Sequence, residues 1–207
     1  MRTLIITADD FGLSPSYDEG IVEAAAEGAI DAVSVMAMRL DGIPGELLSS
    51  DARLGLHLET DEGDLDRAGV EAQLSRLEDL IGRRAEYLDG HHHCHAAPAV
   101  APTVAALAVE RDLAVRSIDP GHRALLRSRG VRTPDLLIGR YEEYEPVLPA
   151  ELGALPEGTT EWMAHPGHPD PSSGSSYDAG REEDLRALLA LRLPDGVTRT
   201  DHRRLGR

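Results

Sequence analysis

Histidine side chains are concentrated in one short segment of this chain, DGHHHCH at residues 89–95, which holds four of the nine histidines. Imidazole nitrogens bind metals and exchange protons near neutral pH. The segment is therefore a candidate metal site, a candidate catalytic cluster, or a polar loop that happens to be rich in histidine. If it is extended, His91, His93 and His95 share a face, and if it is helical, His91 and His95 do. Deciding between these alternatives requires other side chains that converge on the segment.

Carboxylates and further histidines occur where apolar runs end. Asp9 and Asp10 follow the run TLIIT, His57 lies between two leucines, and His165 opens an HPG turn. Adjacent side chains of an extended strand point apart, so one aspartate can bind a metal while the other accepts a proton. The plainer alternatives are that the aspartates cap a turn, His57 is a core residue, and His165 is a polar loop residue.

Cys94 is the single cysteine, and we expect it to be a small packing residue. C-x-x-C spacing is absent, which argues against a closed structural zinc site. Two imidazoles and one carboxylate would instead leave coordination positions open for water and substrate, as in hydrolytic metal centres. The residues alone therefore predict a metal-dependent hydrolase of unknown substrate.

The elements that would position these residues alternate between short apolar runs and helical patterns, which predicts an α/β fold with a parallel sheet and crossover helices. Strands are expected within residues 3–7, 32–38, 54–58, 86–93, 113–118, 135–139, 159–167 and 196–205. Helices are expected from Ser14-Pro15 to Gly28, and within residues 70–83, 99–112 with an interruption at Pro102, 123–129 and 181–193.

The polar candidates share a position relative to these strands, because each lies at or near a carboxyl end. In a parallel barrel or open sheet the carboxyl ends meet on one face, where active sites are built. We therefore expect residues far apart in the sequence to converge there: Asp9, Asp10, His57, His91, Arg116 and His165.

Composition limits the classes of function. The 207 residues suit one domain, expected to span residues 1–207, and the net charge of −16 disfavours nucleic acid and anionic membrane surfaces as partners. Lysine is absent, which excludes Schiff-base chemistry and a Walker-type phosphate lysine. The N-terminal apolar run is too short for a signal peptide, so we expect a cytoplasmic protein.

Several motifs, taken together in order, resemble the YdjC-like carbohydrate deacetylase family. The segment TADDFG followed by a helix is similar to the opening of that family, and LGLHLET is similar to its G-x-H-x-x-x-T segment. LDGHHHCH resembles its L-D-S-H-H-H-V-H segment, while LAVRSID and MAHPGHPD resemble its later arginine strand and C-H-P-G turn. The ordered set spans most of the chain.

The resemblance implies a distorted TIM-like (β/α) barrel that removes an N-acetyl group from an N-acetylated sugar or small glycoconjugate. It implies one divalent metal ion, zinc or magnesium, held by Asp10, His57 and His91. It further implies that Asp9 is the general base, that His165 is the general acid, and that Arg116 orients or polarises the catalytic carboxylate.

The chain also departs from the family pattern near the expected substrate. The segment LETDEGDLDRAG after His57 is short and acidic, glycine replaces serine before His91, and His168 follows the HPG turn where an aromatic residue is common. The particular substrate is therefore open. Two alternatives remain, namely hydrolysis of another amide or an ester, and a non-catalytic protein that binds metal or sugar. Oligomeric state is also open, with a homodimer as one alternative.

Overall fold

The computed structural model describes residues 1–60, 65–139 and 152–206, so part of the acidic segment after His57 lies outside the described residues. Within them the strands are β1 (Arg2–Phe11), β2 (Ala32–Val35), β3 (Arg53–Leu58), β4 (Tyr87–Gly90), β5 (Ala114–Val115), β6 (Leu136–Ile138), β7 (Gly158–Ala164) and β8 (Val197–Arg199). The α-helices are α1 (Pro15–Ala26), α2 (Gly45–Ser49), α3 (Arg67–Ile81), α4 (Ala101–Arg111), α5 (Pro120–Ser128) and α7 (Asp178–Ala190).

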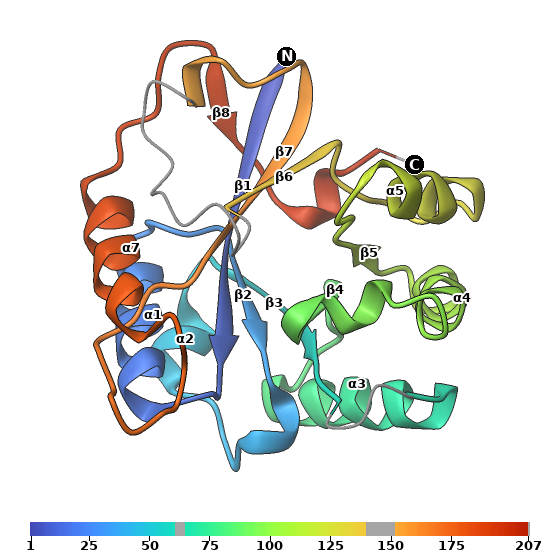
Figure 1. Cartoon of the computed structure of the whole chain (residues 1–207), viewed down its shortest axis with the longest axis horizontal. Helices are drawn as coiled ribbons and strands as arrows, with labels where there is room; N and C mark the ends of the chain where they lie inside the picture. Colours follow the sequence, from blue (N-terminus) through green and yellow to red (C-terminus); the bar gives the residue numbers. More distant parts are fainter. Residues whose placement is uncertain (61–64, 140–151, 207) are drawn as a thin grey trace.

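All these strands pair in parallel in one sheet, in the order β5-β4-β3-β2-β1-β7-β6, with β8 paired to the start of β1. Helices α1, α2 and α7 lie on one side of the strands in Figure 1, and α3, α4 and α5 lie on the other. Helices cover the sheet, and residues 4–11 of β1 are all buried.

The sheet curls into a distorted barrel, as the family resemblance implied. An isolated parallel bridge between Ala114 of β5 and Arg132, which precedes β6, links the two ends of the strand order. The strands therefore follow one another around the barrel in sequence order, from β1 to β7. Because all these strands are parallel, their carboxyl ends lie at one rim of the curled sheet.

Side chains that point into the barrel change character along its axis. Near its base, Ile5 packs in a separate apolar cluster with Ala32, Tyr87, Ala114 and Leu205. On β1, β2 and β4 the inward positions two residues further along are polar (Thr7, Ser34 and Asp89), since alternate residues of a strand face the same side. Thr7 on β1 donates to Glu161 on β7, and Ser34 on β2 donates to Asp89 on β4. The barrel thus has an apolar floor and a polar upper layer.

One glycine makes room for the floor. A Cβ atom at Gly55 of β3 would lie 2.4 Å from the ring of Tyr87, which is far inside contact distance. Tyr87 fills the interior from β4 and stacks on the buried ring of His202 from the C-terminal segment. The last residues of the chain therefore close the base of the barrel.

One helix start differs from its prediction, and another matches it. Pro102 lies in the first turn of α4 rather than interrupting it, because an N-terminal position has no intrahelical hydrogen bond for proline to remove. Ser14 precedes α1 as expected, but its hydroxyl donates to Asp170 and makes no cap hydrogen bond. The expected strand 32–38 ends at Val35 and continues as a 3-10 helix, Ala37–Arg39.

The histidine segment is neither an extended strand nor a regular helix. Residues His91–Ala96 form a 3-10 helix whose backbone is left-handed at His92 (φ 49°) and His93 (φ 59°). The left-handed residues turn successive side chains in different directions, so the segment presents no common histidine face. Among the described residues, no helix is long and apolar enough to cross a membrane.

Candidate metal centre

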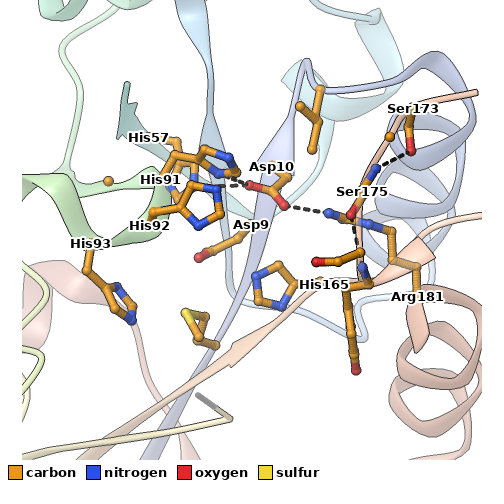
Figure 2. A pocket seen from close by; sticks show the side chains of 16 residues that line it. Asp9, Asp10, His57, His91, His92, His93, His165, Ser173, Ser175 and Arg181 are labelled. Carbon is orange, nitrogen blue, oxygen red and sulfur yellow. Dashed lines mark hydrogen bonds and ion pairs between the residues drawn. The ribbon is translucent and has the colours of Figure 1, made fainter. Parts of the chain in front are cut away.

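A pocket of about 440 Å³ opens at the carboxyl rim of the barrel. Asp9, Asp10, His57, His91 and His165 line it, so the structure brings five of the six predicted site residues to one cavity (Figure 2). The sixth, Arg116, is fully buried behind Asp9. The convergence expected from strand ends is therefore observed, although the role of each residue remains a proposal.

Three side chains from β1, β3 and the histidine segment meet around one point. Oδ1 of Asp10 lies 3.2 Å from Nε2 of His57 and 2.9 Å from Nδ1 of His91, and the two ring centroids are 5.6 Å apart. All three offer ligand atoms within 4.8 Å of one another. The backbone of Asp10 has a φ of 71°, which is uncommon for aspartate and turns this side chain away from that of Asp9.

A second group of possible ligands, Asp9, His57 and Asp89, also has its ligand atoms within 4.8 Å of one another. Arg116 already fills this space, because Nη1 and Nη2 donate to both oxygens of Asp9 and Nη2 lies 2.8 Å from Asp89. A cation there would face a guanidinium, so we assign the candidate ion to the Asp10 side. Two imidazoles and a carboxylate are a donor set that divalent ions accept.

Asp89 fixes the orientation of His57. Its Oδ1 lies 2.7 Å from Nδ1 of His57, and its Oδ2 accepts from Ser34. The carboxylate holds a proton on Nδ1, so Nε2, which faces Asp10, is the nitrogen that would bind an ion once its own proton is lost. Burial would lower the pKa of His57, but Asp89, Asp9 and Asp10 together raise it to about 10 in the ion-free protein.

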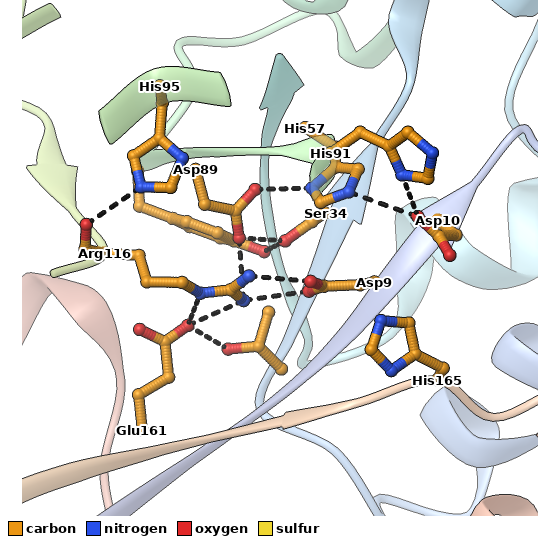
Figure 3. Close-up of polar contacts among 12 residues, drawn as sticks. Asp9, Asp10, Ser34, His57, Asp89, His91, His95, Arg116, Glu161 and His165 are labelled. Carbon is orange, nitrogen blue, oxygen red and sulfur yellow. Dashed lines mark hydrogen bonds and ion pairs between the residues drawn. The ribbon is translucent and has the colours of Figure 1, made fainter. Parts of the chain in front are cut away.

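Asp9 belongs to a different network, shown in Figure 3, which centres on Arg116. Nε of Arg116 donates to Glu161 at 3.0 Å. Nη1 and Nη2 donate to Asp9, and Nη2 also forms an ion pair with Asp89. Burial alone would raise the pKa of Asp9, yet Arg116 and the nearby histidines hold it below its ordinary value. Asp9 is therefore ionised at neutral pH, and its two oxygens are fixed in direction.

His165 directly follows β7 and lies across the pocket from His57 and His91. Its backbone N–H donates to Asp184 of α7 at 2.8 Å, and its ring contacts Tyr177, with centroids 5.6 Å apart. Burial lowers the pKa of His165, and the carboxylates of Asp10 and Asp9 oppose that shift. The imidazole is thus a neutral group that becomes a strong proton donor once protonated.

The other residues of the histidine segment take separate positions. His92 is exposed, and His93 lies on the pocket wall, whereas buried His95 contacts the carbonyl oxygen of Arg116 at 3.1 Å. Sγ of Cys94 donates to the carbonyl oxygen of Leu58, and burial raises the pKa of its thiol to about 11. Cys94 therefore packs as a thiol, in line with the sequence-based expectation.

Three residues of the site were not assigned from the sequence: Asp89, Glu161 and Arg181. Asp89 stands inside the quoted histidine motif, so its place beside His91 was a usable signal. Arg181 occupies the same helix face as buried Leu185 and Leu188, and a charge within an apolar stripe was its only signal. Glu161 is one of several carboxylates, and only the fold distinguishes it.

The barrel and the cluster at its rim define a class of α/β protein with a candidate catalytic metal centre. Residues 3–70 and 67–198 match the family described as YdjC-like protein, and the chain belongs to this family. The family-level resemblance drawn from the motifs is thereby confirmed.

Curated relatives cover most of the chain. A carbohydrate deacetylase of Thermoanaerobacter pseudethanolicus is 28% identical, with 91% of each chain covered. A chitooligosaccharide deacetylase of an Enterobacter species is 27% identical over 98% of this chain and 96% of its own, and a human carbohydrate deacetylase is 30% identical over 90% and 84%.

Among solved structures, an Enterococcus faecalis protein proposed to cleave cellobiose phosphate superposes with a TM-score of 0.77. The alignment covers 98% of both chains at 20% identity, which supports the fold.

Proposed function

We propose that this chain is a metal-dependent carbohydrate N-deacetylase, which hydrolyses the N-acetyl group of an N-acetylated sugar or small glycoconjugate and releases acetate. The observation that carries the proposal is the division of labour between two adjacent aspartates. Asp10 faces two imidazoles, whereas both oxygens of Asp9 accept hydrogen bonds from Arg116 and its side chain still lines the pocket. The deacetylase names of relatives that match most of the chain support it.

Asp10, His57 and His91 would hold the ion. The hydrogen-bonded cluster around the pocket includes four buried carboxylates and two buried guanidiniums, namely Asp9, Asp10, Asp89, Glu161, Arg116 and Arg181. With neutral imidazoles this set carries two negative charges, which a divalent cation balances. When bound, such an ion polarises the acetamide carbonyl and lowers the pKa of water. Zinc and magnesium are the candidates, and zinc suits the two nitrogen ligands better.

Asp9 would act as the general base. Its carboxylate lines the pocket and is ionised, so it can accept the proton of the attacking water. Arg116 fixes its direction with two hydrogen bonds, at the expense of proton affinity. Positioning would therefore contribute more to its efficiency than basicity does.

His165 would act as the general acid on the leaving nitrogen. An amine leaves far more readily than an amide anion, so a proton must reach the nitrogen as the bond breaks. His165 lies across the pocket from His57 and His91, on a different strand from the base. The base Asp9 and the acid His165 could then act on opposite sides of one carbonyl group.

The walls of the pocket suit a small polyhydroxyl substrate. Ser173, Gly174, Ser175, Ser176 and Tyr177 form the side next to His165, and their hydroxyl and backbone groups can hydrogen-bond to sugar hydroxyls. We further propose a cytoplasmic location, and a homodimer remains one expectation for the oligomeric state.

Acetate release from a panel of N-acetylated mono- and oligosaccharides tests the proposal. The enzyme should release acetate from at least one of them, lose this activity after chelation, and regain it when Zn²⁺ or Mg²⁺ is returned. Release from acetate esters or other amides alone would favour the alternative hydrolase. Tight metal binding without any acetate release would favour a non-catalytic binding protein.

A further inference from the structure

Arg181 is a buried charge whose presence the proposed chemistry does not yet explain. It is 1% exposed, lies at the start of α7 and lines the pocket. Its Nη2 donates to Oδ2 of Asp10 at 2.6 Å, and its guanidinium carbon lies 3.9 Å from the ring centroid of Tyr17. Nε and Nη1 have no hydrogen-bond partner among the described residues. An incompletely paired buried guanidinium is unfavourable for stability, which points to a functional reason.

The two oxygens of Asp10 have separate partners. Oδ1 faces His57 and His91, whereas Oδ2 is held by Arg181 (Figure 2). Resting on the metal centre proposed above, we propose that Arg181 is a positioning residue for Asp10. It holds Oδ2, so that Oδ1 alone would be free to bind an ion, and it neutralises part of the carboxylate charge.

This arrangement has two opposing consequences. A guanidinium beside a carboxylate ligand competes with the ion for negative charge, so it weakens metal binding. A bound ion would then keep more of its positive charge for the substrate, because Oδ2 of Asp10 is already held by Arg181. Arg181 thus lowers affinity for the ion in favour of its reactivity.

The same helix also holds the candidate acid. The carbonyl oxygen of Arg181 accepts from the backbone N–H of Gly167 at 3.2 Å, and Asp184 accepts from that of His165. Helix α7 therefore positions a metal ligand and the HPG turn together. If the role of Arg181 were purely structural, its replacement would displace both Asp10 and the HPG turn. The proposed electrostatic role instead predicts that metal affinity depends on the charge at position 181.

The test compares Arg181→Gln with Arg181→Lys, which are similar in size and differ in charge. Co²⁺ affinity is measured by competition with a chelator, without substrate. Arg181→Gln should bind Co²⁺ about tenfold more tightly than the wild type, and its Co²⁺ absorption bands should shift because the second oxygen of Asp10 is released. Arg181→Lys should stay near the wild-type affinity. Arg186→Gln, at an exposed position on the same helix, should leave the Co²⁺ affinity and the absorption bands unchanged.

Equal Co²⁺ affinities in the Gln and Lys variants, or weaker binding by the Gln variant, would overturn the role of Arg181 while acetate release by the wild type still upheld the proposed function. A wild type that binds no Co²⁺ would overturn both. Circular dichroism checks folding of each variant. Should Arg181→Gln not fold, the Lys variant alone decides, since a tenfold change with the charge retained contradicts the proposal.

Discussion

At the scale of single residues, the neighbouring carboxylates Asp9 and Asp10 are distinguished by their partners. Asp9 is fixed by a bidentate ion pair with Arg116, and Asp10 meets His57 and His91. The left-handed backbone of Asp10 separates the two directions. One aspartate is thereby available to an ion and the other to a proton.

We predict that Asp9→Asn lowers kcat by about 10²–10⁴-fold and leaves metal content unchanged, because the amide cannot accept the proton but does not touch the ion. Asp10→Asn should lose both activity and metal. Acetate release and metal analysis of the purified variants measure the two effects. Comparable metal loss in both variants would contradict the division of labour.

Asp18 supplies a pH-dependent prediction away from the ion. Burial raises its pKa from 3.8 to about 6, despite the hydrogen bond from the Gly12 backbone N–H and the charge of Arg181. Since the folded-state pKa lies above the unfolded one, the native protein retains a proton between pH 4 and 6 that the unfolded chain has lost. The contribution of Asp18 to the free energy of unfolding is therefore lost as pH rises through about 6.

Asp18→Asn should accordingly gain stability relative to the wild type by about 1–2 kcal/mol between pH 4 and 7, after allowance for partial exposure. Urea unfolding at both pH values measures the difference. Glu19→Gln, an exposed neighbour, serves as the control. A difference between Asp18→Asn and wild type that does not vary with pH would count against the buried-carboxyl explanation.

At the scale of elements, the turn that carries His165 is packed against α1 through two glycines. A Cβ atom at Gly20 would lie 2.6 Å from the Cα atom of Gly167, which is backbone and cannot rotate away. The backbone N–H of His168 also donates to Ser16 at 3.1 Å. Helix α1, directly after the two aspartates, therefore sets the position of the candidate acid across the pocket.

Gly20→Ala should consequently destabilise the protein by about 1–3 kcal/mol, although alanine usually stabilises a helix interior relative to glycine. The displaced HPG turn should also reduce kcat. Thermal unfolding and acetate release measure the two effects. Gly45→Ala in α2, where a Cβ atom meets nothing within 4 Å, is the matched control. A stabilised Gly20→Ala variant would show that the close contact is easily relieved.

At the scale of the whole molecule, the barrel separates stability from chemistry along its axis. Its floor is apolar and is closed by Leu205 and His202 from the end of the chain, while the polar layers lie toward the rim. Changes at the floor should therefore affect folding more than metal binding.

His202→Ala is expected to lower the free energy of unfolding by about 1–3 kcal/mol, because it leaves a cavity beside Tyr87 and removes a stacked ring. Its Co²⁺ affinity should remain that of the wild type. Urea unfolding and chelator competition provide the comparison, with exposed Arg204→Ala as the control. A large loss of metal affinity would show that the floor and the rim are coupled through Glu161, which lies 3.6 Å from His202.

The sequence by itself determined the strand–helix alternation, the carboxyl-end positions of the polar residues, and the donor types available for a metal. Those properties are local, since they follow from the spacing of apolar residues and from which residues end each run. The positions of α3 and α7 and of most strands were predictable for the same reason.

Only the tertiary structure decided which of these residues contact one another, and therefore which role each is proposed to have. The Arg116 network, the hydrogen bond of Asp89 to His57 and the ion pair of Arg181 with Asp10 join residues separated by 27 to 171 positions. Such contacts depend on barrel closure and on which face of a helix meets the rim, and no local pattern encodes either. The directions of the histidines at 91–95 were also beyond the sequence, because they depend on left-handed backbone at two residues that are not glycine.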